Sequence, residues 1–240
     1  QLHDYTVTRL HSYTITHYTL KKMKLAIMQP YFMPYIGYFQ AMAAVDTYVV
    51  YDDIQYIKGG WVSRNNLLIG GEKKMFTIIL KGASPNKMFN EIEIGDDFKK
   101  FERLLQCNYS KAPYYNEIMA LLHEIFIYED RQLANFLCNS YKKLFAYLEI
   151  NTKIILSSTI NKDCSLKAGY KVLDICKSLN ADTYLNAIGG QDLYDKAEFA
   201  SHGINLLFVK TNDIVYKQFK NEFVPNLSII DVLMHNGKEG

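Results

Sequence analysis

The hydrophobic positions of this chain form short apolar runs that alternate with segments of helical periodicity. The runs at 25–28 and 47–51 are nearly continuous in apolar character, which is typical of strands buried on both faces of a sheet. Strands and helices that alternate at this spacing predict an α/β fold with a mostly parallel, doubly wound, Rossmann-like sheet. Further strands are predicted at 74–80, 90–94, 152–156, 182–185 and 205–209, and helices at 38–44, 166–179, 191–200 and 228–234.

A hairpin and a helical insert interrupt this alternation. The glycine pair at 70–71 is a turn signal between 64–69 and the strand predicted at 74–80, so these two segments are expected to pair. Three amphipathic helices then follow one another, with apolar residues every three or four positions. No linker composition separates them, so we predict one domain at 23–240 with a helical insert at about 97–149. The three helices are expected from Asp96-Asp97 to Lys111, at 114–128 and at 131–148.

Residues 1–22 do not fit this pattern. They lack the apolar core of a secretory signal and are rich in threonine, tyrosine and histidine. The first convincing strand begins after Met23, so we interpret 1–22 as a disordered leader or upstream extension and Met23 as the natural start of the domain. The irregular spacing of His3, His11 and His17 argues against a metal cluster there.

The densest stretch of polar and aromatic side chains, 24–65, spans the ends of the first two predicted strands. The first strand ends at Gln29-Pro30, because proline fixes its own φ and cannot donate to a strand ladder. The second strand is followed by Asp52-Asp53. Because ligands of open α/β sheets bind at the carboxyl ends of the strands, this stretch is predicted to form half of an active or binding site.

The candidate catalytic residues are Asp52, Asp53 and Lys58. A carboxylate at a strand end can act as a base, bind Mg²⁺ or accept hydrogen bonds from sugar hydroxyls. Neighbouring strand residues point to opposite faces, so the alternative is that one carboxylate caps a turn while the other is solvated. Lys58 and Arg64 suit a phosphate or carboxylate, but equally an ion-pair network with the two aspartates.

Candidate binding residues surround these groups. Trp61, the only tryptophan, suits stacking on a sugar or base, or alternatively a place in the core. The loop at 29–38 leads into a helix N-terminus, where free amides favour anions. Turns at 157–159 and 189–190 follow later strands, and we expect them to meet the stretch 24–65 at the same sheet edge. The residues predicted to bind substrate are Gln29, Tyr31, Tyr35, Tyr38, Gln55, Trp61, Arg64, Asn65, Ser157, Gly189 and Gly190, and no metal ligands are predicted.

Composition argues against several classes of function. A net charge of +2 without a basic tract argues against nucleic acid as a partner. The 4 cysteines show no metal spacing, and no apolar run reaches the roughly 18 residues of a membrane span. We therefore expect a cytoplasmic protein with reduced thiols that acts on a small molecule. The 19 tyrosines suit half-wet pockets and interfaces, including those of a homo-oligomer.

The chain carries two long motifs, QPYFMPYIGYF at 29–39 and YDDIQYIKGGWVSRN at 51–65. Together they resemble the WbqC-like protein family, and the resemblance extends over essentially Met23 to Gly237. Members of that family lie in bacterial gene clusters for O-antigen and other cell-surface polysaccharides. The resemblance implies a transferase that attaches an amino-acid or acyl group to a nucleotide-linked amino sugar. Its further motifs are YSKAP at 109–113, Ser157-Ser158, YLNAIGG at 184–190, Tyr194, YKQ at 216–218 and LSIIDVL at 227–233.

The segment from the first strand to the second also resembles the nucleotidylyltransferases with an HxGH loop, whose two histidines contact ATP phosphates. The matching positions are Tyr35 and Tyr38, and a neutral tyrosine leaves the phosphate charge to Lys58 or Arg64. The sequence leaves the cofactor open, with a nucleotide, with or without Mg²⁺, as the candidate. The alternatives to the transferase are an ATP-dependent enzyme of this kind and a non-catalytic binding or scaffold protein of the polysaccharide assembly machinery.

Overall fold

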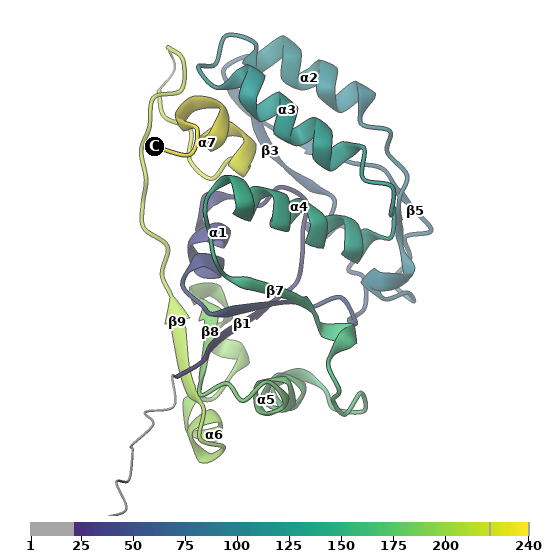
Figure 1. The fold of residues 1–240 in the computed structure, drawn as a ribbon, viewed down its shortest axis with the longest axis vertical. Coiled ribbons are helices and arrows are strands. Elements are labelled where there is room, and N and C mark those ends of the chain that lie inside the picture. The colour runs from purple at the N-terminus through teal and green to yellow at the C-terminus, as the bar shows by residue number, and fades with distance from the viewer. Residues whose placement is uncertain (1–21, 221, 240) are drawn as a thin grey trace, which may run out of the picture.

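A fully parallel sheet of five strands forms the centre of the structure, a computed structural model that describes residues 22–220 and 222–239 (Figure 1). The first strand of the chain lies in the middle of this sheet and is paired on both sides. The predicted α/β fold with a parallel sheet is confirmed. The strands lie in the order β7 (Lys153–Leu156), β2 (Thr47–Val50), β1 (Lys24–Met28), β8 (Thr183–Ala187) and β9 (Asn205–Val209).

Helices cover both faces of this sheet, because successive strand residues point to opposite faces. The odd-numbered residues of β1 pack in a cluster with α5 (Ala168–Ser178) and α6 (Lys196–Ser201). Ala26 and Met28 of β1 belong to the larger core, which includes α1 (Ile36–Ala43) and α4 (Leu133–Tyr147). The sheet is therefore doubly wound, and burial on both faces explains why its strands are almost continuously apolar.

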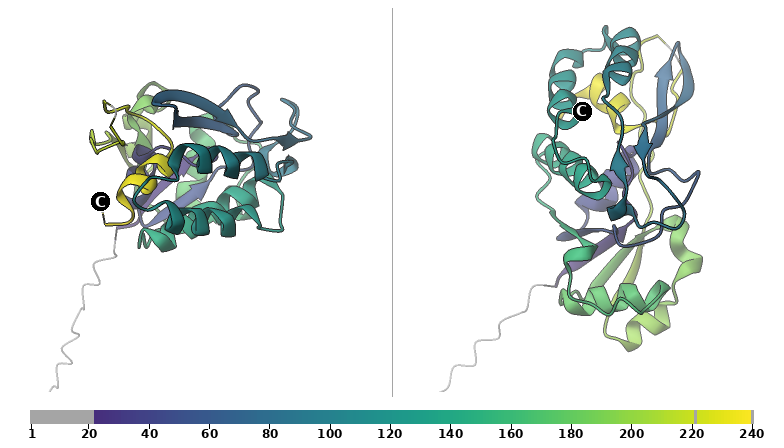
Figure 2. Two further views of the ribbon diagram at one scale, coloured as in Figure 1. Left: turned by 90° about the horizontal axis from the view of Figure 1, so that it is seen from above. Right: turned by 90° about the vertical axis from the view of Figure 1, so that its right-hand side faces the viewer.

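The segment predicted as a helical insert contains three helices, of which α4 is the last. Together with α7 they gather at one end of the molecule, while α5 and α6 lie at the other end (Figures 1 and 2). The first two helices of the insert are α2 (Lys99–Tyr109) and α3 (Tyr115–Phe126). The last helix of the chain, α7 (Ile229–Asn236), lies at the same end of the molecule.

An aromatic stack ties the insert to the loop that follows β1. The ring centroid of Phe98 lies 4.4 Å from that of Phe126 and 5.5 Å from that of Phe136. Phe32, from the loop at 29–35, stacks on Phe98 at 5.7 Å and is fully buried. Such aromatic pairs contribute about 0.5–1.5 kcal/mol each beyond the burial of their area. The insert therefore holds the loop after β1 in place.

The predicted hairpin forms between β3 (Arg64–Ile69) and β4 (Glu72–Thr77), which pair antiparallel along their whole length. The strand predicted at 74–80 begins earlier and ends earlier than its apolar pattern indicates. Its continuation is prevented because the N–H of Ile79 donates to the carboxylate of Asp96 (3.0 Å) and not to a neighbouring strand.

The strand predicted at 90–94 is replaced by a single 3-10 turn and a strand of two residues. The N–H of Met88 donates to the carboxylate of Glu91 (2.7 Å), which closes the turn and takes these residues out of the extended conformation. The elements are η1 (Phe89–Glu91), β6 (Glu93–Ile94) and β5 (Leu80–Lys81), which pairs with β6.

The helix predicted at 191–200 is in fact two helices separated at Tyr194 and Asp195. The carboxylate of Asp195 accepts a hydrogen bond from the N–H of Ala197 (2.7 Å) and so caps the start of α6. The ring of Tyr194 packs edge-on against Phe199, with centroids 5.6 Å apart, and this packing needs an extended backbone between the helices. The first of the two is the 3-10 helix η3 (Ile188–Leu193).

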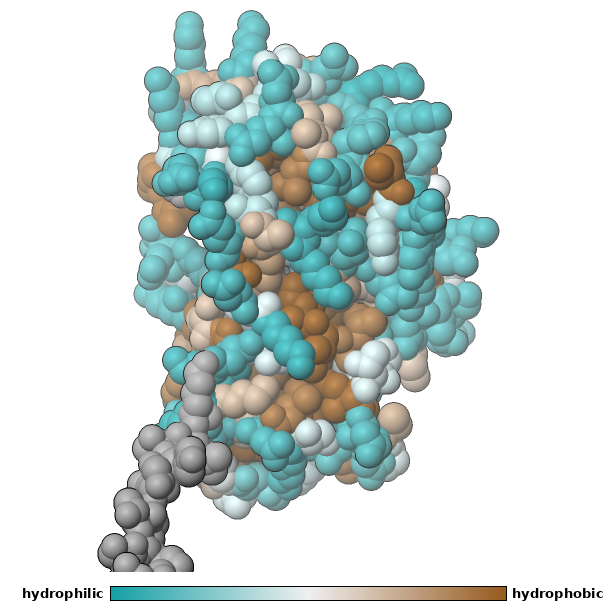
Figure 3. All heavy atoms as spheres, viewed as in Figure 1, coloured by the Kyte–Doolittle hydropathy of each residue, from teal (hydrophilic) through white to brown (hydrophobic). Residues whose placement is uncertain are grey.

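β7 is an edge strand whose apolar side chains, at 154–156, are only partly covered. In the view of Figure 1, apolar side chains gather in the middle of this face (Figure 3). An unpaired strand edge with apolar flanks accepts a strand from another chain. The edge of β7 is therefore the surface through which we expect the predicted homo-oligomer to form.

The leader predicted at 1–22 lies outside the described residues except for Lys22, and so do His3, His11 and His17. The backbone is held in place just before the first strand, because the N–H of Met23 donates to the carboxylate of Asp182 (2.8 Å). Within residues 22–220 and 222–239, no helix is long and apolar enough to cross a membrane.

A long segment, 210–227, returns from β9 to α7 without a helix or strand among its described residues, and we call it the crossing segment. It is tied to the fold by the fully buried Asp231 of α7. The Oδ2 of Asp231 accepts from the hydroxyl of Tyr109 (2.7 Å), and Oδ1 accepts from the hydroxyl of Tyr216 (2.7 Å) and Nε2 of Gln218 (2.9 Å). Asp231 therefore joins α2, the crossing segment and α7.

Replacing Asp231 with alanine should lower the free energy of unfolding by about 2–4 kcal/mol, because three buried donors then lose a charged acceptor. Urea denaturation followed by circular dichroism measures this difference. Asp213→Ala, an exposed position in the same segment, is the matched control and should change stability little. Equal stability of the two variants would show that the Asp231 hydrogen bonds do not hold the fold.

Candidate functional site

A cleft opens at the carboxyl edge of the sheet, where β1 and β8 lie side by side. Numbered along the chain, the five strands have the order 3-2-1-4-5, so the chain moves outward from this point in both directions. Such a switch point leaves a crevice that binds ligands in open α/β sheets. The cleft has a volume of about 650 Å³, which is in the range of sites for small organic ligands. Its walls include Met28 at the end of β1, Gln29 after it and Ala187 at the end of β8.

Aromatic and amide side chains form most of the cleft wall. Among the described residues that line it, Lys73 of β4 is the only cation, and none is a carboxylate. Aromatic faces stack on sugar rings or bases, and amides pair with hydroxyl groups or base edges, so this wall suits a polar ring compound. Six of the predicted binding residues line the cleft: Gln29, Tyr31, Tyr35, Tyr38, Trp61 and Asn65.

Four further polar residues of the wall are missing from the sequence-based set: Asn66, Lys73, Thr211 and Asn226. The sequence could have indicated Asn66, because the predicted hairpin already placed it in a strand next to Asn65. Thr211 and Asn226 belong to the crossing segment, whose sequence has no periodic pattern that places it over the sheet edge.

Buried tyrosines fix the backbone of the loop after β1. The hydroxyl of Tyr141 accepts from the N–H of Tyr31 (2.8 Å) and donates to the carbonyl of the same residue (2.7 Å). The hydroxyl of Tyr38 donates to the carbonyl of Gln29 and lies 2.9 Å from the hydroxyl of Tyr48. Burial raises the pKa of all four tyrosines, so they stay neutral at physiological pH. Tyr48 and Tyr141 are fully buried behind the wall and support Tyr31 and Tyr38, which line the cleft.

The same loop is held from its other side by α7 and β3. The carbonyl of Met33 accepts from Nδ2 of Asn65 (2.6 Å) and from the hydroxyl of Ser228 (2.8 Å). The carbonyl of Pro34 accepts from the N–H of Ile229 (2.7 Å). The two bonds from Ser228 and Ile229 join the last helix to the loop after β1, and the bond from Asn65 joins that loop to β3.

Trp61 is the most exposed aromatic residue of the cleft wall, with 55% of its surface exposed. The guanidinium carbon of Arg64 lies 5.6 Å from the centre of the Trp61 ring, which is within range of a cation–π contact. The Nε of Arg64 is buried without a hydrogen-bond partner among the described residues. Arg64 thus supports the ring and does not itself line the cleft.

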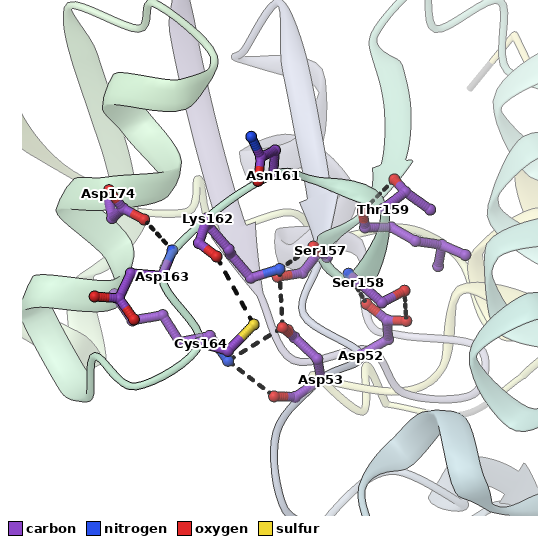
Figure 4. Close-up of polar contacts among 12 residues, drawn as sticks. Asp52, Asp53, Ser157, Ser158, Thr159, Asn161, Lys162, Asp163, Cys164 and Asp174 are labelled. Carbon is purple, nitrogen blue, oxygen red and sulfur yellow. Dashed lines mark hydrogen bonds and ion pairs between the residues drawn. The ribbon is translucent and has the colours of Figure 1, made fainter.

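Asp52 and Asp53, at the end of β2, form a separate cluster with residues after β7 (Figure 4). The two oxygens of Asp52 accept from the N–H (2.9 Å) and hydroxyl (2.6 Å) of Ser158, and the side chain is almost fully buried. The Oδ2 of Asp53 lies 2.9 Å from Nζ of Lys162 and 3.1 Å from Nζ of Lys171. Neither carboxylate lines the cleft.

The ion-pair network expected for these aspartates is present, but its cations are Lys162 and Lys171, not Lys58 and Arg64. Burial favours a raised pKa for Asp53, but the nearby hydroxyl of Ser157 and the two lysines outweigh it and hold the pKa below its usual value. Asp53 is therefore ionised at neutral pH and is neutralised by its partners. A carboxylate held in this way is suited to positioning the strand ends and is poorly suited to accepting a proton.

The other predicted site residues lie at the same sheet edge but outside the cleft wall. Lys58 and Gln55 are exposed in the loop between β2 and β3, while Ser157 is buried after β7. Gly189 and Gly190 lie in η3 after β8, so all of these turns share the edge that the sequence predicted. A Cβ on Gly190 would collide with the side-chain amide of Asn186, which explains the glycine without a ligand.

Metal binding has no clustered ligands in the described part of the chain. Within residues 22–220 and 222–239, no three histidine, cysteine, aspartate or glutamate side chains come together in a way that could hold an ion. The cleft is thus built from neutral polar groups, aromatic rings and a single lysine.

The chain is similar to a known protein and to a protein family over most of its length. It is 28% identical over 228 residues to the uncharacterized protein Rv1507c of Mycobacterium tuberculosis, a match that covers 90% of this chain and 95% of that protein. No solved structure matches the chain. Residues 29–240 match the WbqC-like protein family, and this range includes the cleft loop, the aspartate cluster and the crossing segment. The chain therefore belongs to the WbqC-like protein family.

Proposed function

We propose that the protein binds a nucleotide-linked amino sugar in the switch-point cleft and transfers an amino-acid or acyl group to it, as a step in the synthesis of a bacterial cell-surface polysaccharide. The observation that carries this proposal is the cleft of about 650 Å³ at the switch point, with its aromatic and amide wall. Its volume suits a ligand of this size, and its position is where doubly wound sheets bind nucleotides.

Different parts of the wall suit different parts of such a ligand. The exposed ring of Trp61 offers a face for the base or the sugar, with Arg64 behind it. Lys73 is the cation of the wall and suits the diphosphate, and its Nζ already lies 3.3 Å from the carbonyl of Pro225. The side chains of Gln29 and Asn226 line the same cleft, and their amides suit hydrogen bonds with sugar hydroxyls.

In the proposed reaction, the amine of the sugar attacks the carbonyl carbon of an activated donor. The amide C–N bond forms as the bond from that carbon to the leaving group breaks, and the leaving group departs with the proton that the amine loses. The wall holds no carboxylate or histidine among its described residues to take this proton. Lys58, exposed three residues before Trp61 in the same loop, stays the candidate for contact with the donor or the phosphates. Asp52 and Asp53 are assigned a positioning role, because their partners already satisfy their charge.

A second candidate is an ATP-dependent enzyme, which the N-terminus of α1 favours. Tyr35 precedes this helix and lines the cleft, and the first turn carries no acidic residue that would repel a phosphate. Tyr38 cannot take the part of an HxGH histidine, because its hydroxyl is bonded to the carbonyl of Gln29 and to Tyr48. Phosphate contacts would then come from backbone amides and Lys73.

The proposal predicts that a UDP-linked amino sugar raises the melting temperature more than ATP, UDP or the free amino sugar does. Trp61→Ala should weaken binding, measured by isothermal titration, by about tenfold or more, because a stacking surface is lost. Ile57→Ala is the matched control, since Ile57 is exposed in the same loop and does not line the cleft.

Each outcome of this experiment decides between the candidates. Selective binding of ATP would replace the first function with the second. Binding of the sugar nucleotide, with no mass increase of the sugar when acyl donors are supplied, would favour a binding or scaffold protein. Equal weakening by Trp61→Ala and Ile57→Ala would remove the cleft from the proposal.

The positioning role of Asp53 predicts a pH-dependent loss of stability in Asp53→Asn. At pH 7 this variant should have a free energy of unfolding lower by about 2–4 kcal/mol, because it leaves the buried Lys162 and Lys171 without a counter-charge. Because the folded-state pKa of Asp53 is lowered, the wild type keeps this contribution above the ordinary aspartate pKa of about 3.9 and loses it as the pH falls further.

Urea denaturation of both proteins from neutral pH to pH 3 measures the difference, which should shrink below about pH 4. Asp97→Asn is the control, because Asp97 has an exposed ion pair with Lys99. If Asp53→Asn kept full stability at every pH and lost only turnover, a catalytic role for Asp53 would be restored.

A further inference from the structure

A second hollow lies where the end of α2, the crossing segment and the last turn of α7 meet. It has a volume of about 760 Å³ and shares none of its lining residues with the cleft. The proposed transferase reaction makes no use of it. The residues that matter for its chemistry are Cys107, Lys111, Lys217, Phe219, Lys220 and His235.

The wall of this hollow is strongly biased toward positive charge. Lys111, Lys217 and Lys220 line it, and no aspartate or glutamate does so among the described residues. None of the three lysines forms an ion pair with another described residue. Cations on one concave surface reinforce each other's potential, so an anion that enters the hollow is attracted by all three.

Two of the three lysines stand close in the chain to residues that donate hydrogen bonds to Asp231. Lys111 follows Tyr109 by two residues, and Lys217 stands between Tyr216 and Gln218. These three neighbours all donate to the carboxylate of Asp231. The buried carboxylate thus fixes the backbone that carries Lys111 and Lys217, and both line the hollow together with Lys220. A site whose charges are assembled before binding loses less free energy in ordering them.

An aromatic floor completes the hollow. The rings of His235 and Phe219 meet edge to face with centroids 4.5 Å apart, and His235 lies one helical turn after Asp231. The Nε2 of His235 is buried and has no hydrogen-bond partner among the described residues. Burial lowers the pKa of His235 although the charge of Asp231 opposes this, so the imidazole is neutral and the charge comes from the lysines.

We propose that this hollow is a binding site for a phosphorylated small molecule, whose phosphate lies among Lys111, Lys217 and Lys220 and whose organic part packs against Phe219. Ammonium groups at three points suit the several oxygens of a phosphate. The apolar ring beneath them suits an organic phosphate better than a bare ion. This site is independent of the proposed transferase function, and its test does not require turnover.

A cysteine in the wall of the hollow can report on binding there. Cys107 lines the hollow and is exposed, whereas Cys164 is exposed elsewhere, on the loop before α5. Alkylation requires the thiolate, so an anion bound beside Cys107 slows its reaction both by covering it and by cancelling the lysine charge. The rates at the two thiols are read separately by mass spectrometry of tryptic peptides after brief exposure to N-ethylmaleimide.

Glucose 1-phosphate and inorganic pyrophosphate are the probes, with potassium chloride at equal ionic strength as the reference. When the probe concentration is roughly ten times Kd, alkylation of Cys107 should slow by about tenfold, while the rate at Cys164 stays unchanged. The double variant Lys111→Gln/Lys220→Gln should lose the protection. Lys100→Gln, an exposed lysine of α2, the helix that carries Cys107, should keep it.

Protection by potassium chloride alone, equal slowing at both cysteines, or protection that persists in the double variant would each overturn the proposal. Both substituted lysines are exposed, so the variant is expected to fold, and its circular dichroism spectrum checks this. Stronger protection by glucose 1-phosphate than by pyrophosphate would support the role of the aromatic floor, and stronger protection by pyrophosphate would overturn that part.

Discussion

Parallel pairing of β1 between β2 and β8 is the constraint on which the rest of the structure depends. The backbone of β1 is bonded on both sides and its side chains are buried on both faces, so its register cannot slip without exposing apolar surface. Because every strand of the sheet runs the same way, all carboxyl ends open at one edge. Pro30 ends β1 at that edge, and the polar groups of the first half of the chain gather beyond it.

Most of the charge near this edge is used to hold the structure together. Asp52 binds Ser158, and Asp53 is shared by two lysines. A buried charge without partners is very unfavourable, so both oxygens of Asp52 accept hydrogen bonds and Oδ2 of Asp53 lies between two lysines. The cleft between β1 and β8 is left with rings, amides and one lysine. Its selectivity therefore has to come from shape, stacking and neutral hydrogen bonds, with the electrostatic groups acting behind the wall.

The fold could be predicted from the sequence because the patterns that mark its strands and helices are local in the chain. Apolar runs bounded by proline, glycine or aspartate mark the strands, and helical periodicity marks the insert. Errors arose where a side chain competes with the backbone ladder, as Asp96 does at Ile79, or where a cap divides a helix, as Asp195 does. Such competition depends on contacts in the folded chain, which periodicity does not contain.

The candidate site was accessible only in part, for the same physical reason. The loop after β1 could be recognised from its prolines, glycine and aromatic residues. Its supports could not, because Tyr141 lies 110 residues after Tyr31 and no sequence pattern connects them. Lys171 likewise lies 118 residues after Asp53, so the sequence suggested nearer lysine and arginine residues as its partners.

The bonds made by α7 have a consequence for the order of folding. Ser228 reaches back 195 residues to Met33 beside the cleft, and Asp231 reaches back 122 residues to Tyr109 beside the hollow. Contacts that close such long loops form late, after local contacts have offset part of the chain entropy. Both cavities are therefore completed by the same docking event. A ligand of either one stabilises the finished protein by mass action but cannot guide the earlier assembly of the sheet.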